Sequence, residues 1–112
     1  IHRKINQARE AVSKNRISIV NPISLAADAL ELGFEIENIA STLTGLLGEI
    51  ATKDYVGQYP PQRSYEGEIL QCELFPFRWS SKSLGCRVYL KFAIKEDQMW
   101  LVSLHEDRTK EE

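Results

Sequence analysis

Apolar and polar residues alternate with a period of two in the last third of the chain. Between Gly85 and Lys95 one side of the pattern is apolar and the other is polar: Val88, Leu90, Phe92 and Ile94 alternate with Arg87, Tyr89, Lys91 and Lys95. This alternation is typical of a strand with one buried face. A second apolar run, Met99 to His105, follows a polar stretch. We therefore predict a β-hairpin.

The length of the turn decides which face His105 occupies. A two-residue turn, Glu96-Asp97, would place Tyr89 opposite Leu104 and put His105 among apolar side chains. A three-residue turn that also contains Gln98 pairs apolar with apolar and polar with polar: Leu90 with Leu104, Phe92 with Val102, Ile94 with Trp100, Tyr89 with His105, and Lys91 with Ser103. A slip of one residue exchanges the faces of a strand, so burial favours the longer turn and a core position for Trp100. A phenol, an imidazole and two or three cations then share one face, a set able to bind and cleave a phosphodiester.

Helical spacing dominates the first half of the chain. A first helix is predicted from His2 to about Asn15. Asn21-Pro22 supplies a cap and a first-turn proline for a second helix, which stops at Gly33. A third helix begins near Glu35. The expected buried positions are Ile5, Ala8, Ala11 and Val12 in the first helix, Ile23, Ala26, Ala27 and Leu30 in the second, and Ile36, Ile39, Ala40, Leu43 and Leu47 in the third.

A short fourth helix is expected from about Glu49 to Lys53-Asp54. Residues 56–61 contain two prolines and form a loop. Residues 68–75 alternate as a strand that Pro76 ends, and residues 78–85 are a polar connection. Helices come first and strands second, which indicates an α+β fold. We expect one domain over residues 1–112, with the helices of residues 2–54 packed on one face of a small antiparallel sheet within residues 66–106.

Composition limits the function classes. The formal net charge of −2 over 112 residues is not typical of a nucleic-acid-binding domain. The charge is unevenly distributed, however, because residues 74–95 contain no acidic residue and five basic ones: Arg78, Lys82, Arg87, Lys91 and Lys95. Such a patch can bind phosphate, although the alternative is a solvated strand face with scattered lysines.

Other classes find little support in the sequence. No apolar run approaches the roughly 20 residues that cross a bilayer, and the start lacks the apolar segment of a signal peptide. We therefore expect a soluble, cytoplasmic protein that binds no membrane. Cys72 and Cys86 lack metal-ligand spacing and are expected to be reduced core thiols. No Asp, Glu and His cluster has ligand spacing either, so no metal site and no cofactor are expected.

Four short segments carry a resemblance that spans most of the chain, from about Leu25 to Glu106. They are Glu31-Leu32-Gly33-Phe34, Gly45-Leu46, Val88-Tyr89-Leu90-Lys91 and Val102-Ser103-Leu104-His105-Glu106. In their order and spacing the chain resembles the MqsR family of bacterial toxins, a branch of the RelE-like ribonucleases. The resemblance implies a RelE-like fold and an mRNA interferase that cuts single-stranded mRNA through the ribose 2′-OH, without metal. It also implies a type II toxin neutralised by a cognate antitoxin, and operator DNA as a partner of the complex.

The resemblance also assigns site residues. Lys53 falls on the family's active-site lysine, Gln71 and Pro76 on its Gln…Pro strand, and Tyr89 on its active-site tyrosine. His105 stands where a family member carries a lysine, and the loops before Gln71 and Tyr89 are longer than expected.

Each candidate has a functional and a structural interpretation. His105 is either an acid or base, or a strand-end histidine that hydrogen-bonds the backbone. Tyr89 either acts in the reaction, as a donor to the phosphate or by orienting the nucleophile, or covers apolar surface as an amphipathic strand tyrosine. Lys53 either binds substrate or complements a helix dipole, and Gln71 either contacts RNA or is plainly exposed. The expected phosphate-binding residues are Arg78, Lys82, Arg87 and Lys91. For Arg87 and Lys91 the alternative is pairing with Glu106 or Asp107.

Trp79 either stacks on a base or packs in the core, and core packing is the safer interpretation. Two functions therefore remain open for the whole chain. The first is a metal-independent endoribonuclease toxin. The second is a non-catalytic module whose hairpin edge and basic patch bind an antitoxin-like partner and operator DNA.

Overall fold

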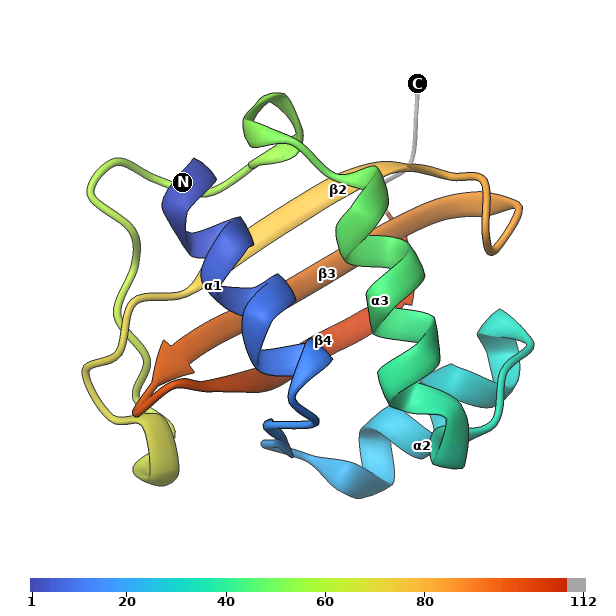
Figure 1. Cartoon of the computed structure of the whole chain (residues 1–112), viewed down its shortest axis with the longest axis horizontal. Helices are drawn as coiled ribbons and strands as arrows, with labels where there is room; N and C mark the ends of the chain where they lie inside the picture. Colours follow the sequence, from blue (N-terminus) through green and yellow to red (C-terminus); the bar gives the residue numbers. More distant parts are fainter. Residues whose placement is uncertain (109–112) are drawn as a thin grey trace.

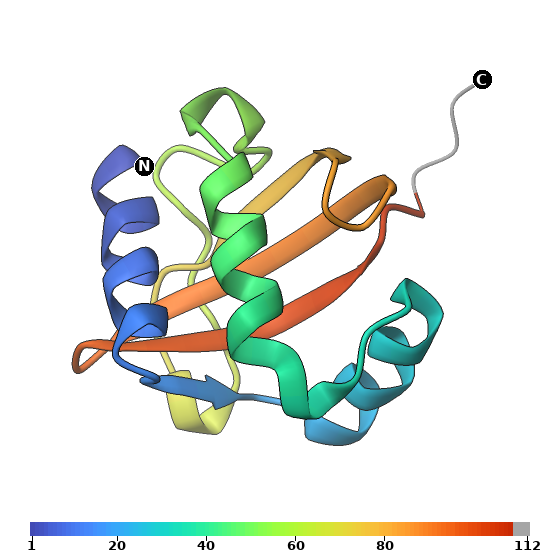
Figure 2. The same ribbon diagram turned by 45° about the vertical axis from the view of Figure 1, so that its right-hand side comes forward.

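The computed structural model describes residues 1–108, and its elements form an α+β fold as predicted. Along the chain they are α1 (His2–Ser13), β1 (Ile17–Ile19), α2 (Pro22–Leu32), α3 (Ile39–Glu49), β2 (Phe75–Ser81), β3 (Cys86–Lys95) and β4 (Gln98–Glu106), with 3₁₀ turns η1 (Ile36–Asn38), η2 (Thr52–Asp54) and η3 (Gly67–Ile69). Helices α1 and α3 lie side by side across one face of the sheet, and α2 lies beyond its β1 and β4 edge (Figures 1 and 2). No helix within residues 1–108 is long and apolar enough to cross a membrane.

The sheet is mixed, which corrects the prediction of an antiparallel sheet confined to residues 66–106. Within the described residues its strand order is β1-β4-β3-β2, and β1 runs parallel to β4 with Ile17 opposite Met99 and Ile19 opposite Leu101. The predicted helical half therefore contributes a strand. Three residues are too few to show a strand periodicity, and β1 forms because the connection between α1 and α2 passes the open edge of β4.

The β3–β4 hairpin combines both of the registers considered above. Its turn has two residues, Glu96 and Asp97, both with positive φ (53° and 62°), so the predicted three-residue turn is wrong. The two-residue register holds from the turn to the pair Phe92–Leu101. A β-bulge at Val102 then shifts it, and from Lys91–Ser103 onward the predicted pairs form, including Leu90–Leu104 and Tyr89–His105.

The bulge also decides which side chains of β4 are buried. Met99, Leu101 and Leu104 belong to the core, whereas Trp100 is only partly buried and pairs with Ala93 on the other face. The predicted pairs Phe92–Val102 and Ile94–Trp100, and the core position of Trp100, are therefore wrong. One extra residue is enough to exchange the faces between the turn and the bulge.

The packing of α1 confirms its predicted face, and a hydrogen-bonding arginine joins it to α3. Ile5, Ala8, Ala11 and Val12 are all buried. Arg9 donates from Nε to the carbonyl of Leu47 at 2.8 Å and from an Nη to that of Ile50 at 3.1 Å. Leu47 lies in the last turn of α3, whose carbonyls have no partner within the helix, and Ile50 directly follows the helix. Arg9 therefore ties the two sheet-covering helices together.

Helix α2 has the predicted ends and a different buried face. The Asn21 side chain accepts from the Ser24 N–H, and Gly33 ends the helix with φ of 87°. The buried residues are Leu25, Ala29 and Leu32, while Ile23 and Leu30 are 86% and 77% exposed. Two apolar stripes compete on this helix, and the one that meets β4 is the one that packs. In α3 the buried set is Leu43, Leu46 and Leu47, with Ile39 and Ala40 only partly buried. The predicted start near Glu35 is wrong, since Ile36, also partly buried, belongs to η1.

The second strand lies later in the chain than predicted. Residues 68–75 do not form the expected strand. Instead β2 begins at Phe75, contains Pro76 and extends to Ser81 through part of the predicted polar connection. Pro76 is tolerated because β2 is at the sheet edge and its carbonyl points outward, where it accepts from Val56 N–H at 3.0 Å. Trp79 is consequently a buried strand residue. The predicted fourth helix is only the 3₁₀ turn η2, since the backbone is extended at Ile50.

Candidate active site

Tyr89 and His105 form the centre of the candidate site on the helix-free face of the sheet. They are direct partners in the β3–β4 register, and their rings stack with centroids 5.2 Å apart and planes inclined by 25°. Their strand neighbours Val88, Leu90 and Leu104 are fully buried in the core under the helices. Alternation therefore directs the phenol and the imidazole to the opposite face.

Arg78 joins this pair from β2. It lies opposite Tyr89 in the β2–β3 register, and its guanidinium carbon is 4.9 Å from the centroid of the phenol ring. Tyr89 thus has a cation on one side and an imidazole on the other. This contact was not predicted, because the sequence placed residue 78 in a connecting segment. It forms because β2 extends to Ser81.

Asp107 holds the two arginines at the end of the site. Its Oδ1 is 3.2 Å from Arg78 Nε, and its Oδ2 is 3.5 Å from Arg87 Nε. The Asp107 side chain is only 5% exposed, whereas those of Arg78 and Arg87 are 38% and 49% exposed. The pairing of Arg87 with the acidic tail, one of the two interpretations above, is therefore present, and the guanidinium groups still have solvent-facing donors.

The phenol of Tyr89 is held in its protonated form. Burial raises its pKa above the ordinary value of 10.0, and the positive charge of Arg78 opposes this only in part. A phenol that keeps its proton at neutral pH can donate it to a developing oxyanion.

His105 has one ring nitrogen fixed by the backbone. Nδ1 is 2.7 Å from the carbonyl oxygen of Glu106. A carbonyl only accepts, so Nδ1 carries the hydrogen, and in the neutral ring Nε2 keeps its lone pair. The expected alternative of a backbone hydrogen bond is thus observed, and it leaves Nε2 as a positioned acceptor rather than removing the residue from the site.

Two depressions adjoin Arg78 and bring further cations near it. The first, of about 230 Å³, is lined by Arg78, Tyr89 and Lys91 together with residues of the 56–62 loop. The second, of about 370 Å³, is lined by the cations Lys53, Arg78 and Arg87 and by the carboxylates Glu49 and Asp54. Lys53 and Lys91 form no ion pair within residues 1–108. Arg78 lines both depressions and connects them.

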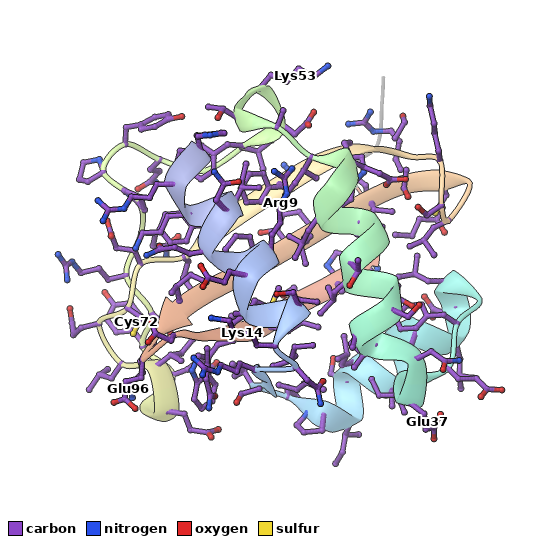
Figure 3. The ribbon with its side chains drawn as sticks, in the orientation of Figure 1. Arg9, Lys14, Glu37, Lys53, Cys72 and Glu96 are labelled. Atoms are coloured by element: carbon purple, nitrogen blue, oxygen red, sulfur yellow. The ribbon has the colours of Figure 1, made fainter. Side chains whose placement is uncertain are left out.

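Gln71 is not where the sequence analysis expected it. It lies in a turn with φ of 66°, exposed, and its backbone carbonyl accepts from Arg63. The neighbouring η3 is fastened to the hairpin end, where Lys95 donates to the carbonyl of Glu68 at 2.7 Å. Figure 3 shows the adjacent Cys72 near Glu96, at the opposite end of the molecule from Lys53. Gln71 therefore does not join the other candidates, because the strand that was to carry it starts at Phe75.

Glu49 organises the border of the site and was missed by sequence reasoning. Its carboxylate accepts from Trp79 Nε1, Ser81 Oγ and both the N–H and Oγ of Ser83 at 2.7–2.9 Å. Partial burial raises its pKa, but these hydrogen bonds outweigh that effect and lower the pKa from 4.5 to about 2. Glu49 thereby anchors the β2–β3 loop, on which Lys82 is exposed. No local pattern indicates this role, since the donors lie some thirty residues further along the chain.

The comparisons with known proteins assign no family to this arrangement. No protein-family model and no curated protein matches the chain. Within the described part of the chain, no three His, Cys, Asp or Glu side chains come together as a possible metal-binding group. The chemistry of the site therefore has to be argued from its own residues.

Proposed function

We propose that this chain is an endoribonuclease of the RelE-like fold, similar to the MqsR toxins, that cleaves single-stranded mRNA without a metal ion. The observation that carries the proposal is the Tyr89–His105 stack with the Arg78 guanidinium against the phenol. These three groups match the needs of phosphodiester cleavage, which are a base, an acid and a positive charge for the phosphorane.

The proposed reaction uses the ribose 2′-OH of the substrate as nucleophile. His105 Nε2 takes the 2′ proton as the 2′ oxygen attacks phosphorus. The bond from phosphorus to the 5′ oxygen breaks, and the Tyr89 phenol gives its proton to that oxygen. The products are a 2′,3′-cyclic phosphate and a 5′-hydroxyl end. Arg78 and Lys91 stabilise the charge on the phosphate oxygens.

Neighbouring phosphates would be held by the remaining cations. Lys53 and Arg87 line the 370 Å³ depression together with Arg78. In this proposal the substrate backbone runs along that depression. Lys82 is exposed on the adjacent loop and is suited to a more distant phosphate. Gln71 has no part in the proposed step, because it lies at the other end of the sheet.

In the cell we propose a cytoplasmic toxin of a type II toxin–antitoxin pair. A cognate antitoxin would hold it inactive, and the complex would bind operator DNA. Expression alone should then arrest growth, and coexpression of the partner should restore it.

The alternative of a non-catalytic module loses one of its arguments. It relied on an exposed hairpin edge, but β2 covers β3 from Cys86 to Phe92 and β1 covers β4 at Met99–Leu101, which leaves residues 102–106 of β4 as the part of that edge without a strand partner among the described residues. We therefore keep it only as an outcome of the test. A protein that leaves RNA intact with and without ribosomes, and whose expression is harmless, would favour that alternative.

The direct test is cleavage of labelled single-stranded RNA in excess chelator. Tyr89→Phe and His105→Gln should each slow cleavage about 100-fold or more, the usual loss on removing a general acid or base. The matched controls are Tyr65→Phe and His2→Gln, because both parent side chains are exposed and lie outside the site. Equal rates for all four variants would refute the proposed roles.

A further inference from the structure

The 230 Å³ depression beside Tyr89 has one wall that the proposed reaction does not use. Tyr89 and Lys91 form the catalytic side of the depression. The opposite side comes from Gln58 and Gln62 of the 56–62 loop and from Leu74 and Pro76. This volume exceeds that of several water molecules, which occupy about 30 Å³ each in the liquid. A substrate group attached to the scissile phosphate would enter it.

The loop is tied to the body of the protein at both ends. Tyr55 bridges to Phe77 of β2, and Val56 N–H donates to the Pro76 carbonyl at 3.0 Å. On the return, Leu74 N–H donates to the Gln62 carbonyl at 2.8 Å. The wall of the depression is therefore built before any ligand arrives.

The tip of the loop is also held in place. The Tyr55 hydroxyl donates to the carbonyl of Gln58 at 2.6 Å, and the rings of Tyr55 and Tyr59 meet edge to face with centroids 5.1 Å apart. Gly57 has no room for a side chain, since a Cβ there would overlap the Tyr55 hydroxyl and lie 2.9 Å from Pro76 Cδ. These contacts fix the backbone that presents the two glutamines.

The side chains on this wall have the chemistry of base recognition. Gln58 and Gln62 are exposed, and no hydrogen bond within residues 1–108 occupies either side-chain amide. Each amide offers a donor and an acceptor that can pair with the edge of an unstacked base, as in recognition of single-stranded RNA. Leu74 and Pro76 supply apolar surface for the face of a ring, and Lys91 and Arg78 lie at the phosphate side.

We propose that this depression is a nucleobase subsite, which binds the base of a nucleotide next to the scissile phosphate and gives the enzyme a sequence preference. The inference rests on the proposed ribonuclease function and adds that the 56–62 loop contacts the base of one substrate nucleotide. A glutamine amide forms a bidentate pair best with adenine, so adenine is the first base expected there.

The first experiment tests binding without cleavage. The protein is labelled with ¹⁵N and titrated with AMP, CMP, GMP and UMP, and with ribose 5-phosphate as the control that lacks a base. The side-chain amide signals of Gln58 and Gln62 should shift with the nucleotides, most with AMP, and stay in place with ribose 5-phosphate. Equal shifts with ribose 5-phosphate, or none with any nucleotide, would overturn the subsite.

The second experiment tests preference in the reaction. Cleavage positions on one long RNA are mapped for the wild type, for the double variant Gln58→Ala/Gln62→Ala, and for Glu68→Ala, an exposed control outside the depression. The double variant should still cut RNA, more slowly at the preferred positions, and lose selectivity at one nucleotide. An unchanged pattern with retained activity would refute the subsite and leave the ribonuclease proposal standing. Base-dependent amide shifts in a wild-type protein that cuts no RNA would instead support the subsite and refute the ribonuclease proposal.

Discussion

Replacement of Glu49 by glutamine should destabilise the fold strongly at neutral pH and little in acid. The carboxylate accepts two hydrogen bonds at each oxygen, from Trp79, Ser81 and Ser83. An amide keeps only one acceptor oxygen, and in either orientation its NH₂ group would face an N–H donor, that of the Ser83 backbone or that of the Trp79 indole. At least one hydrogen bond to the β2–β3 loop must then be lost.

The size of the effect follows from the pKa of Glu49. Its fall from 4.5 to about 2 means that the folded protein favours the ionised form by roughly 3 kcal/mol, at about 1.4 kcal/mol for each unit. Solvent screening reduces this at a partly exposed carboxylate, so we expect Glu49→Gln to lower the free energy of unfolding by about 2 kcal/mol at pH 7. Because the folded pKa is the lower one, this stabilisation is complete above pH 4.5 and is lost as the pH falls toward 2.

The assay is urea unfolding followed by tryptophan fluorescence at pH 7, 5, 4 and 3. Glu37→Gln is the matched control, since Glu37 is exposed and accepts no side-chain hydrogen bond from the described residues. The difference in unfolding free energy between wild type and Glu49→Gln should shrink steadily below pH 4.5, while the control stays close to wild type throughout. A difference that is absent at pH 7, or as large at pH 3 as at pH 7, would show that the carboxylate does not anchor the loop.

Three further predictions concern other contacts. Gly57→Ala should lower the melting temperature and reduce the free energy of unfolding by about 1–3 kcal/mol, because the new Cβ would overlap the Tyr55 hydroxyl. An unchanged melting curve would contradict this. Arg9→Met should lower the free energy of unfolding in urea by about 1–3 kcal/mol, because it leaves the carbonyls of Leu47 and Ile50 without this donor. A stability equal to that of the wild type would show that these two hydrogen bonds do not stabilise the fold. Asp107→Asn should tighten RNA binding by up to about fivefold at low salt, since it removes the negative charge that competes with RNA phosphates for Arg78. Weaker binding of the variant in a filter assay would contradict this competition.

Local signals in the chain predicted several elements without help from tertiary contacts. The buried face of α1 was correct because one apolar stripe stands out among charged residues. The ends of α2 were correct because Asn21, Pro22 and Gly33 act through the backbone within a few residues. The Tyr89–His105 pair was also correct, although the turn from which it was predicted was wrong, because the bulge at Val102 restores the register in which Val88, Leu90 and Leu104 are buried.

Other features depended on what each segment meets in space. Helix α2 carries two apolar stripes, and only its contact with β4 selects Leu25, Ala29 and Leu32 for burial. Strand β1 exists because β4 offers an open edge. The loop before β2 is long, so the sequence could not show that pairing would begin at Phe75, and this start moved Gln71 out of the site and Arg78 into it.

The sequence by itself therefore determined the fold class, the first helix and the limits of the second, because each of these follows from interactions between near neighbours or from one strong burial pattern. Only the tertiary structure decided the bulge at Val102 and the position of Arg78 against Tyr89. It also decided the ion pairs of Asp107 with the two arginines and the loop wall with Gln58 and Gln62. These depend on register and on contacts between distant segments, where competing arrangements differ by a single residue and the packing of the whole chain makes the choice.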